Sequence, residues 1–177
     1  MKEKIDVAAY AEQIVRAMPK GILLNTNGEK LNTMVIGWGA LGTVWARPAF
    51  TVYVRESRYT KAQLDRTGEF TISVPLGAPD LHVTQFCGHA SGRDYDKFGE
   101  AGLTPEPPEV IGTPGVREYP LTLECRVLYT QPQEPALLPP DILEQSYPQT
   151  VPDPDPMAGR DMHTMYIGEI VSAYIIR

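Results

Sequence analysis

Apolar residues near the start of the chain recur every three or four positions, which is the spacing of one face of an α-helix. Asp6 precedes this run in a position suited to a helix N-cap, and Pro19 and Gly21 follow it as residues that end helices. We therefore expect residues 1–20 to hold an N-terminal helix that covers the body of the protein. The apolar positions are Val7, Tyr10, Ala11, Ile14, Val15 and Met18.

Beyond residue 20 the pattern changes to short apolar runs and to alternation of apolar and polar residues, which is typical of β-strands. Asn27-Gly28 stands between the first two runs and is a strong hairpin signal. The second run continues through Ile36 into a glycine-rich section at 37–42. The pattern predicts a mainly β protein with strands at 21–26, 31–36, 50–55, 69–74, 119–131 and 163–176.

Short helices and proline-rich connections separate these strands. We expect a helix at 59–66 that ends at Gly68, and a second helix at 80–87 with Asp80 as its N-cap. Apolar residues alternate along 119–131, which predicts one buried face with Cys125 as a small core residue.

Three segments carry few apolar residues or many prolines. Residues 88–102 are polar, and we expect a loop that contains a short helix. Residues 104–116 are rich in Pro and Gly and are interpreted as a surface connector. Eight prolines interrupt 132–156, so we expect the segment 132–162 to form a Pro-rich arm, either a lid or an arm on a partner subunit.

Composition and charge narrow the class of protein. The 177 residues suit a single domain, 1–177, and the net charge of -6 argues against a nucleic-acid partner. Two cysteines and three histidines without metal spacing predict neither a disulfide framework nor a metal site. We find no signal peptide and no apolar stretch of membrane-spanning length, so we expect a cytoplasmic protein without a membrane partner.

Residues 37–42 match the G-x-G-x-x-G fingerprint of dinucleotide-binding folds. That fingerprint needs a helix that begins at its third glycine, so that a pyrophosphate lies at the helix N-terminus. The following residues, 43–48, contain β-branched side chains and end in Pro48, which disfavours a helix there. We therefore reject the dinucleotide-binding interpretation.

The stretch from 32 to 60 instead suits a planar ring with a phosphate tail. Its glycines and Trp38 offer backbone amides and a flat apolar wall, although a bulge at a barrel corner explains the glycines nearly as well. Arg55, Arg58 and Thr60 lie where a strand ends and a helix begins, which favours an anion. The alternative for Arg58 is an exposed turn residue paired with Glu56. Our interpretation is a groove for a flavin nucleotide.

Lys97 and His163 are the two candidates for direct chemistry. A cation near the pyrimidine edge of a flavin would stabilise negative charge on reduction, and the turn at 91–94 could present Lys97, with Asp94 as a cap. The alternative is that Lys97 pairs with Asp94 or Glu100. His163 enters the last strand from a loop, where it either makes a strand-end hydrogen bond or contacts an active site.

The chain resembles the flavin reductase-like family with an FMN-binding split β-barrel, to which flavoredoxins belong. The resemblance spans about 20–131 and the strand from His163. It implies a six-stranded Greek-key barrel with flanking short helices, a homodimer, and FMN near the dimer interface. The segments that carry it are Asn32-Thr33-Met34, Ile36-Gly37-Trp38-Gly39, Trp45 with Pro48, Val54-Arg55, Arg58-Tyr59-Thr60, Phe70, Cys87-Gly88, Ser91-Gly92-Arg93-Asp94, Asp96-Lys97-Phe98, His163 and Gly168-Glu169.

The resemblance also implies which residues would hold the cofactor. Arg55, Arg58, Tyr59 and Thr60 would lie nearest the phosphate, and Lys97 near the ring. The expected catalytic positions are Lys97 and His163. The full set of expected cofactor-binding residues is Asn32, Thr33, Met34, Gly37, Trp38, Gly39, Arg55, Arg58, Tyr59, Thr60, Cys87, Gly88, Ser91, Gly92 and Lys97.

These expectations lead to an FMN-binding oxidoreductase. A reduced nicotinamide, NADH or NADPH, would pass a hydride to flavin N5, and the electrons would then go to free flavin or to a protein acceptor. One alternative is a noncatalytic FMN electron carrier that takes electrons from a protein donor. A third hypothesis is a barrel that binds another ligand such as haem, with His163 as the axial ligand.

Overall fold

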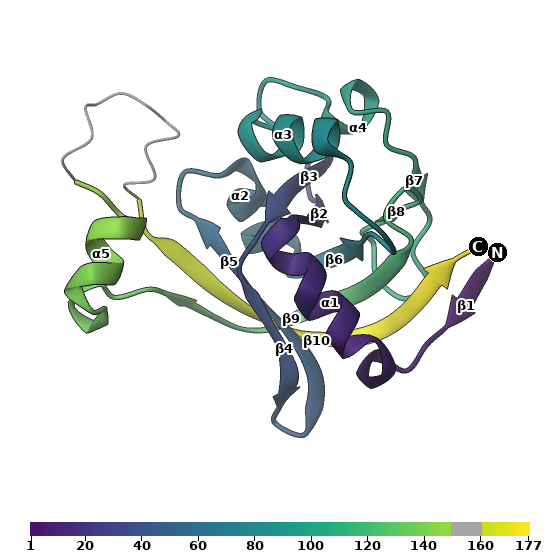
Figure 1. Ribbon diagram of the computed structural model, residues 1–177, viewed down its shortest axis with the longest axis horizontal. Helices are drawn as coiled ribbons and strands as arrows, with labels where there is room; N and C mark the ends of the chain where they lie inside the picture. The colour runs from purple at the N-terminus through teal and green to yellow at the C-terminus, as the bar shows by residue number, and fades with distance from the viewer. Residues whose placement is uncertain (150–160) are drawn as a thin grey trace.

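An antiparallel sheet of eight strands forms the body of the protein, as the computed structural model shows for the residues that it describes, 1–149 and 161–177 (Figure 1). The strands are hydrogen-bonded in the order β3-β2-β6-β9-β10-β5-β4, and β1 pairs with β10. Their bounds are β1 Lys2–Lys4, β2 Ile22–Asn27, β3 Leu31–Ile36, β4 Gly39–Val44, β5 Arg47–Arg55, β6 Glu69–Val74, β9 Leu121–Pro132 and β10 His163–Ile176. Two shorter strands, β7 Pro105–Glu106 and β8 Gly115–Val116, pair with each other.

The chain itself brings the two ends of this strand order together. β3 and β4 stand at opposite ends of the order, yet only Gly37 and Trp38 separate them in the sequence. Because consecutive Cα atoms lie about 3.8 Å apart, the end of β3 and the start of β4 must lie close together. The sheet therefore curls into a barrel, as expected, with more strands than the expected six.

The glycine-rich section makes the barrel corner that was considered at 37–42. A single strand running from β3 through this section was expected, and that expectation is wrong, because the chain turns at Gly37 and Trp38 and β4 pairs with β5. A Cβ at Gly39 would lie 2.8 Å from the carbonyl oxygen of Thr51, so the close approach of β5 requires glycine there.

No helix follows Gly42, in agreement with the rejected dinucleotide-binding interpretation. β4 and β5 form a hairpin in which Val44 pairs with Arg47. The two residues between them, Trp45 and Ala46, have φ angles of 50° and 58°. Such positive values are what a two-residue hairpin turn with the correct twist needs, although they are costly for residues other than glycine.

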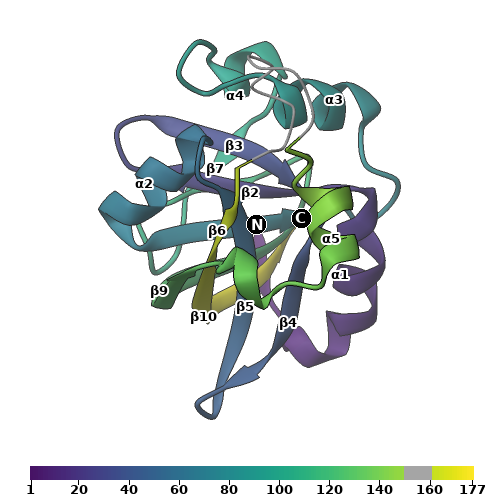
Figure 2. The same cartoon turned by 90° about the vertical axis from the view of Figure 1, so that its left-hand side faces the viewer.

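Helices flank the barrel, and Figures 1 and 2 both show α3 and α4 over β3. Asp80 caps α3 as expected, and Gly68 ends α2 with a φ of 63°. The cap of α4 is Asp96, whose side chain accepts from the amide of Gly99, and not Asp94 as expected. The bounds are α1 Ala11–Ala17, α2 Tyr59–Thr67, α3 Leu81–His89, α4 Lys97–Glu100 and α5 Pro140–Ser146, with 3-10 turns at Val7–Tyr10, Met18–Lys20 and Pro135–Leu137.

Two apolar clusters hold the layers together. The first fills the barrel and includes Phe50, Phe70 and Cys125, all fully buried. The second lies between the outer face of β2 and the helices α3 and α4, and it includes Leu23 and Cys87. Burial of Cys125 confirms its expected role as a small core residue.

Segment 104–116 is more buried than a surface connector. Glu124 on β9 is fully buried, and its carboxylate accepts hydrogen bonds from the amides of Glu109, Val110 and Ile111 at 2.6, 2.8 and 3.2 Å. The segment therefore covers the second face of β9. For this reason residues 121–125 are buried on both faces of the strand, whereas the alternation of apolar residues predicted one buried face.

The N-terminus and the arm also differ from expectation. β1 precedes the N-terminal helix, which consists of α1 between two 3-10 turns, with Asp6 as the cap of the first. The arm was expected to lack regular structure, yet it contains α5 at the end of the molecule away from both termini (Figure 1). The rest of the arm, 150–160, lies outside the described residues.

Candidate functional site

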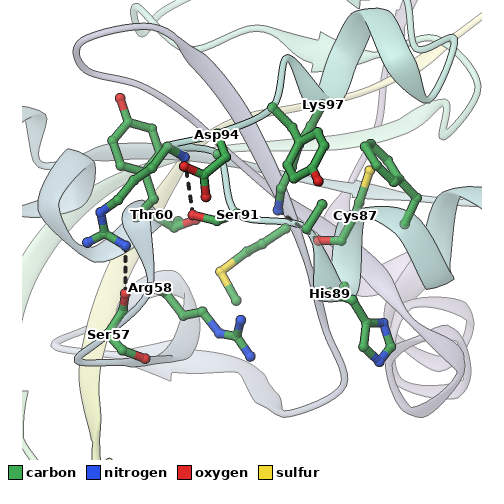
Figure 3. A pocket seen from close by; sticks show the side chains of 16 residues that line it. Ser57, Arg58, Thr60, Cys87, His89, Ser91, Asp94 and Lys97 are labelled. Atoms are coloured by element: carbon green, nitrogen blue, oxygen red, sulfur yellow. Dashed lines mark hydrogen bonds between the residues drawn. The ribbon is translucent and has the colours of Figure 1, made fainter. Parts of the chain in front are cut away.

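A cavity of about 530 Å³ lies between the start of α2 and the end of α3 (Figure 3). Its volume falls within the range of small-molecule sites. The loop before α2 lines one wall, and the loop after α3 lines the opposite wall. Met34 of β3 and Lys97 of α4 also line it, together with Ser57, Arg58, Tyr59, Thr60, Phe86, Cys87, Gly88, His89, Ala90, Ser91, Gly92, Arg93, Asp94 and Tyr95.

The α2 side of this cavity suits an anion. Arg58 is the N-cap of α2 and makes no side-chain cap hydrogen bond, and Tyr59 and Thr60 of the first turn line the cavity. Figure 3 shows the Arg58 side chain extending across the cavity toward the side where His89 lies. Burial lowers the pKa of the Arg58 guanidinium, while the nearby Asp161 carboxylate opposes that shift. The cation is thus partly desolvated, which strengthens its attraction for an anion.

Contacts across the cavity hold the two loops together. Arg93 donates a hydrogen bond from Nη1 to the carbonyl oxygen of Ser57 at 2.9 Å, and its guanidinium lies 5.7 Å from the centre of the Tyr59 ring. The amide of Arg93 donates to Oγ of Ser91 at 3.2 Å. These bonds fix the loop after α3 against the start of α2.

Asn32 supports the wall from behind. Its Nδ2 donates to Oγ1 of Thr60 at 3.0 Å, and both residues are buried. A Cβ at Gly92 would lie only 2.1 Å from Oδ1 of Asn32 and 2.7 Å from Cδ1 of Tyr59. Within the described residues, Oδ1 of Asn32 and Oγ1 of Thr33 are buried without a hydrogen-bond partner. Buried acceptors of this kind are rare unless a ligand or water satisfies them.

Lys97 is a buried cation at the floor of the cavity, with 4% of its surface exposed. Its ammonium donates hydrogen bonds of 2.9 Å to the carbonyl oxygens of Thr33 and Cys87. It thus bonds to carbonyls, and not to Asp94 or Glu100 as the alternative proposed. Burial lowers the pKa of Lys97 to about 8, with a smaller contribution from Arg58 in the same direction.

A second cavity of about 180 Å³ adjoins the first, because Met34 and Arg58 line both. Trp38 and His163 line this second cavity, and their ring centres lie 4.9 Å apart at a tilt of 45°. Trp38 is about half exposed (48%) at the barrel corner, so it offers the flat apolar wall that was expected.

His163 makes the hydrogen bond that was expected at the end of a strand, because its Nδ1 lies 2.8 Å from the hydroxyl of Tyr147, and it also lines the second cavity. Burial, with smaller contributions from Arg55 and Arg58, lowers the pKa of His163 to about 4 against the opposing Asp161. The imidazole is therefore neutral at pH 7.

Arg55 is turned toward the arm. Its Nη1 donates to the carbonyl oxygen of Asp161 at 2.7 Å, and its Nη2 donates to that of Ser146 at 3.0 Å. Its guanidinium also lies 5.2 Å from the centre of the Tyr147 ring. Arg55 lines the second cavity together with Arg58, and it does not line the first cavity, where Tyr59 and Thr60 lie.

The structure brings most of the expected site residues together, in three groups. Gly39 lines neither of these two cavities but a third one next to them, and Asn32 and Thr33 lie behind the wall. Gly37, Trp38, Arg55 and His163 line the second cavity. The first cavity is lined by Met34, Arg58, Tyr59, Thr60, Cys87, Gly88, Ser91, Gly92 and Lys97.

Several lining residues were missed by the sequence analysis. Phe86 and His89 belong to the end of α3, where only Cys87 and Gly88 were expected to contribute. The ring of Tyr95 stands 5.8 Å from that of Phe86, edge to face. These side chains share one wall because the last turn of α3 lies beside the loop that follows it. The sequence pattern predicts the helix but not which cavity its last turn would line.

Neither a metal cluster nor a membrane-spanning helix occurs among the described residues. Among residues 1–149 and 161–177, no three His, Cys, Asp or Glu side chains are arranged to hold a metal ion. Across the same residues, every helix is too short or too polar to cross a membrane.

Comparison with protein families gives a match over most of the chain. Residues 15–177 match the family described as "Flavin reductase like domain". An uncharacterized protein of Escherichia coli, YddH, is 32% identical over 101 residues, which are 56% of this chain and 52% of that protein. The chain therefore aligns with about half the length of this relative.

Solved structures share the fold. A flavoredoxin from Methanosarcina acetivorans is 26% identical, with a TM-score of 0.64 over 89% of this chain and 68% of that one. An FMN-binding domain of a flavin reductases-like enzyme from Shewanella baltica is 18% identical, with a TM-score of 0.68 over 99% of this chain and 77% of that one. At the latter identity the likeness concerns the fold alone.

Proposed function

Because this chain belongs to the flavin reductase-like family, we propose that it is an FMN-binding oxidoreductase. The observation that carries the proposal is the pair of adjoining cavities that share Met34 and Arg58. One cavity offers cations and helix amides for a phosphate, and the other offers the Trp38 ring for a planar group. The two features that FMN combines thus lie side by side.

Residues behind the wall of the first cavity shape it for such a ligand. Asn32 donates a hydrogen bond of 3.0 Å to Thr60, although neither Asn32 nor Thr33 lines the cavity. The backbone at Gly92 comes so close to Asn32 that a Cβ would clash, so the loop forms a tight cradle. We propose that Arg58, Thr60 and this loop hold the phosphate.

When bound, FMN supplies the two-electron redox chemistry. The protein itself would bind FMN, orient it and set the electrostatic field around it. Lys97 lines the first cavity and not the one that Trp38 lines, so we propose that its ammonium acts on FMN from the side of the first cavity, where its positive charge favours anionic forms of the cofactor. His163 is neutral at pH 7 and orients the Trp38 wall by ring contact, while Arg55 fixes the arm beside it.

We also propose an electron donor, an oligomeric state and a cellular location for this protein. We propose NADH or NADPH as the electron donor, in keeping with the reductase family of the chain. A homodimer is proposed because large apolar side chains such as Trp45 and Tyr129 are exposed next to each other. A cytoplasmic location is proposed because both cysteines are free and buried.

Absorption spectroscopy of the purified protein tests FMN binding. We expect a two-peaked flavin spectrum and saturable binding of added FMN. Riboflavin is the matched control, because it has the same ring without the phosphate, and we expect it to bind at least tenfold more weakly. Equal affinities would contradict the proposed phosphate site, and a Soret band would instead support the haem hypothesis.

Anaerobic mixing with NADH or NADPH tests the enzyme activity. Bleaching of the bound flavin, with oxidised nicotinamide formed in equal amount, is the expected result. A flavin that stays oxidised with both nucleotides would contradict the reductase proposal. The likeness to the Methanosarcina flavoredoxin would then favour the alternative, a noncatalytic carrier that takes electrons from a protein donor.

A further inference from the structure

A third cavity, of about 670 Å³, lies between α5 of the arm and the barrel corner. We call it the arm cavity. Trp38 and Tyr53 line both the arm cavity and the second cavity, so the two adjoin. Leu138 and Ile142 of the arm and Met18 after α1 line its other sides.

The lining of the arm cavity differs in charge from that of the first cavity. Among the residues that the structure describes, those that line it are all uncharged, whereas Arg58, Arg93 and Lys97 line the first cavity. An anionic ligand would therefore lose its hydration in the arm cavity without gaining a cation. Free FMN and nicotinamide dinucleotides, which carry phosphates, do not fit this lining.

The polar groups in the arm cavity are few and uncharged. Tyr53, Gln133 and Ser146 contribute them, among apolar and aromatic neighbours. Mostly apolar walls with a small number of polar groups are typical of sites for small organic molecules. Trp38 adds an aromatic face on which a flat ring can stack.

The arm is fastened in the position that forms this cavity. Ser146, at the end of α5, accepts a hydrogen bond from Nη2 of Arg55 at 3.0 Å. The next residue, Tyr147, is 4% exposed, and its hydroxyl lies 2.6 Å from Oε1 of Gln133 and 2.8 Å from Nδ1 of His163. Bonds to β5, to β10 and to Gln133 directly after β9 thus hold α5 in place, which preorganises the cavity for a ligand.

We propose that the arm cavity binds a neutral aromatic molecule of one or two rings that carries a hydroxyl or carbonyl group. The binding itself does not depend on FMN. The role of such a molecule as a substrate next to the cofactor rests on the function proposed above.

Equilibrium dialysis of the full chain against 2-naphthol tests the proposal, with 2-naphthalenesulfonate as the charged probe of the same ring system. We expect saturable binding of 2-naphthol at one site, and binding of the sulfonate at least tenfold weaker. Equal binding of the two probes would overturn the proposal, as would the absence of saturable 2-naphthol binding.

Matched variants locate the site. Ile142→Glu places a charge in the arm cavity on a side chain that is 42% exposed, and it should weaken 2-naphthol binding at least tenfold. Leu137→Glu is the control, because Leu137 belongs to the same arm, is 82% exposed and does not line the cavity. Ala40→Phe fills the cavity without a charge and should also weaken binding.

Unchanged 2-naphthol binding in both Ile142→Glu and Ala40→Phe would overturn the proposal. The proposal would also be overturned if Ile142→Glu changed the oligomeric state in sedimentation but kept 2-naphthol binding. The arm cavity would then be an interface between two copies of the chain. FMN affinity is measured in parallel and should not change in either variant. If the unmodified protein does not bind FMN but binds 2-naphthol, the proposed function is contradicted and the proposal for the arm cavity is still supported.

Discussion

Gly92 is the residue at which the candidate site tolerates the least change. The Asn32 amide and the Tyr59 ring both occupy the space that a Cβ would need. These two contacts come from β3 and from the start of α2, so one glycine lets three segments meet. The tight packing is also what brings the loop at 91–93 up to the proposed phosphate site.

We expect Gly92→Ala to weaken FMN binding by roughly tenfold, or about 1.4 kcal/mol. The added Cβ would push the loop away from Asn32, at a stability cost of about 1–3 kcal/mol. Flavin fluorescence titration and thermal melting measure the two effects. Gly77→Ala is the control, since a Cβ there meets no atom within 4 Å. FMN affinity equal to that of the unmodified protein would contradict a role for the loop in binding.

We expect Lys97 to make FMN binding depend on pH. Because burial lowers its pKa to about 8, Lys97 is mostly charged at pH 7 and mostly neutral at pH 9. An anionic ligand favours the charged form, so affinity should fall as the pH rises through about 8, by roughly tenfold between pH 7 and pH 9. FMN titrations at a series of pH values measure this effect.

Two variants test the assignment to Lys97. Lys97→Met should bind FMN more weakly at pH 7 and should lose the step near pH 8. Lys61→Met is the control and should keep the step, because Asp65 raises the pKa of Lys61 and holds it charged through this range. A step of the same size in Lys97→Met would show that another group titrates.

At the scale of elements, the arm depends on the end of α5. Tyr147 joins this end to β10 through His163 and also bonds to Gln133, the residue after β9. The carbonyl oxygen of Ser146 adds the bond from Arg55 on β5. Two strands of the barrel therefore bond to one turn of the arm, although α5 itself buries little apolar surface.

Tyr147→Phe should loosen the arm, because it removes the hydroxyl that bonds to Gln133 and His163. We expect a loss of about 1–3 kcal/mol of stability and faster amide hydrogen exchange over α5. Tyr129→Phe is the control, because that hydroxyl bonds to Gln131 on the exposed part of β9 and should change stability by less than about 0.5 kcal/mol. Equal losses in the two variants would mean that the buried hydroxyl does not fasten the arm.

At the scale of the whole molecule, the barrel leaves an apolar surface uncovered. Trp45 is 61% exposed at the β4–β5 hairpin, and its ring centre lies 6.3 Å from that of Tyr129. Contiguous exposed side chains of this size are typical of surfaces that pair with another chain.

We expect the protein to sediment as a dimer, and we expect Trp45→Glu to raise its dissociation constant at least tenfold by placing a charge in this surface. Sedimentation velocity over a range of concentrations measures the change. Leu81→Glu is the control, because Leu81 is 72% exposed on the helix α3 and distant in sequence from the hairpin. A monomer at all concentrations would contradict the homodimer proposal.

The amino-acid sequence by itself determined, to within two residues, the bounds of β2, β3, β6, β9, β10, α2 and α3, but it did not predict β1, β4 or α5. β6 and β10 begin and end where the alternation predicted, and Asp80 and Gly68 bound their helices as expected. These features depend on local physics, namely side-chain periodicity, capping and backbone preference. The nearness of Arg58, Thr60 and the loop after α3 followed from several short motifs taken together.

Only the tertiary structure decided which partner each polar group meets. Lys97 bonds to carbonyls of β3 and α3 that are 64 and 10 residues away, and Arg55 bonds to the arm 91 and 106 residues away. Periodicity and capping act within a few residues, so they carry no information about contacts across the barrel. The closure of the sheet at Trp38 and the burial of 104–116 against β9 likewise depend on packing between distant segments.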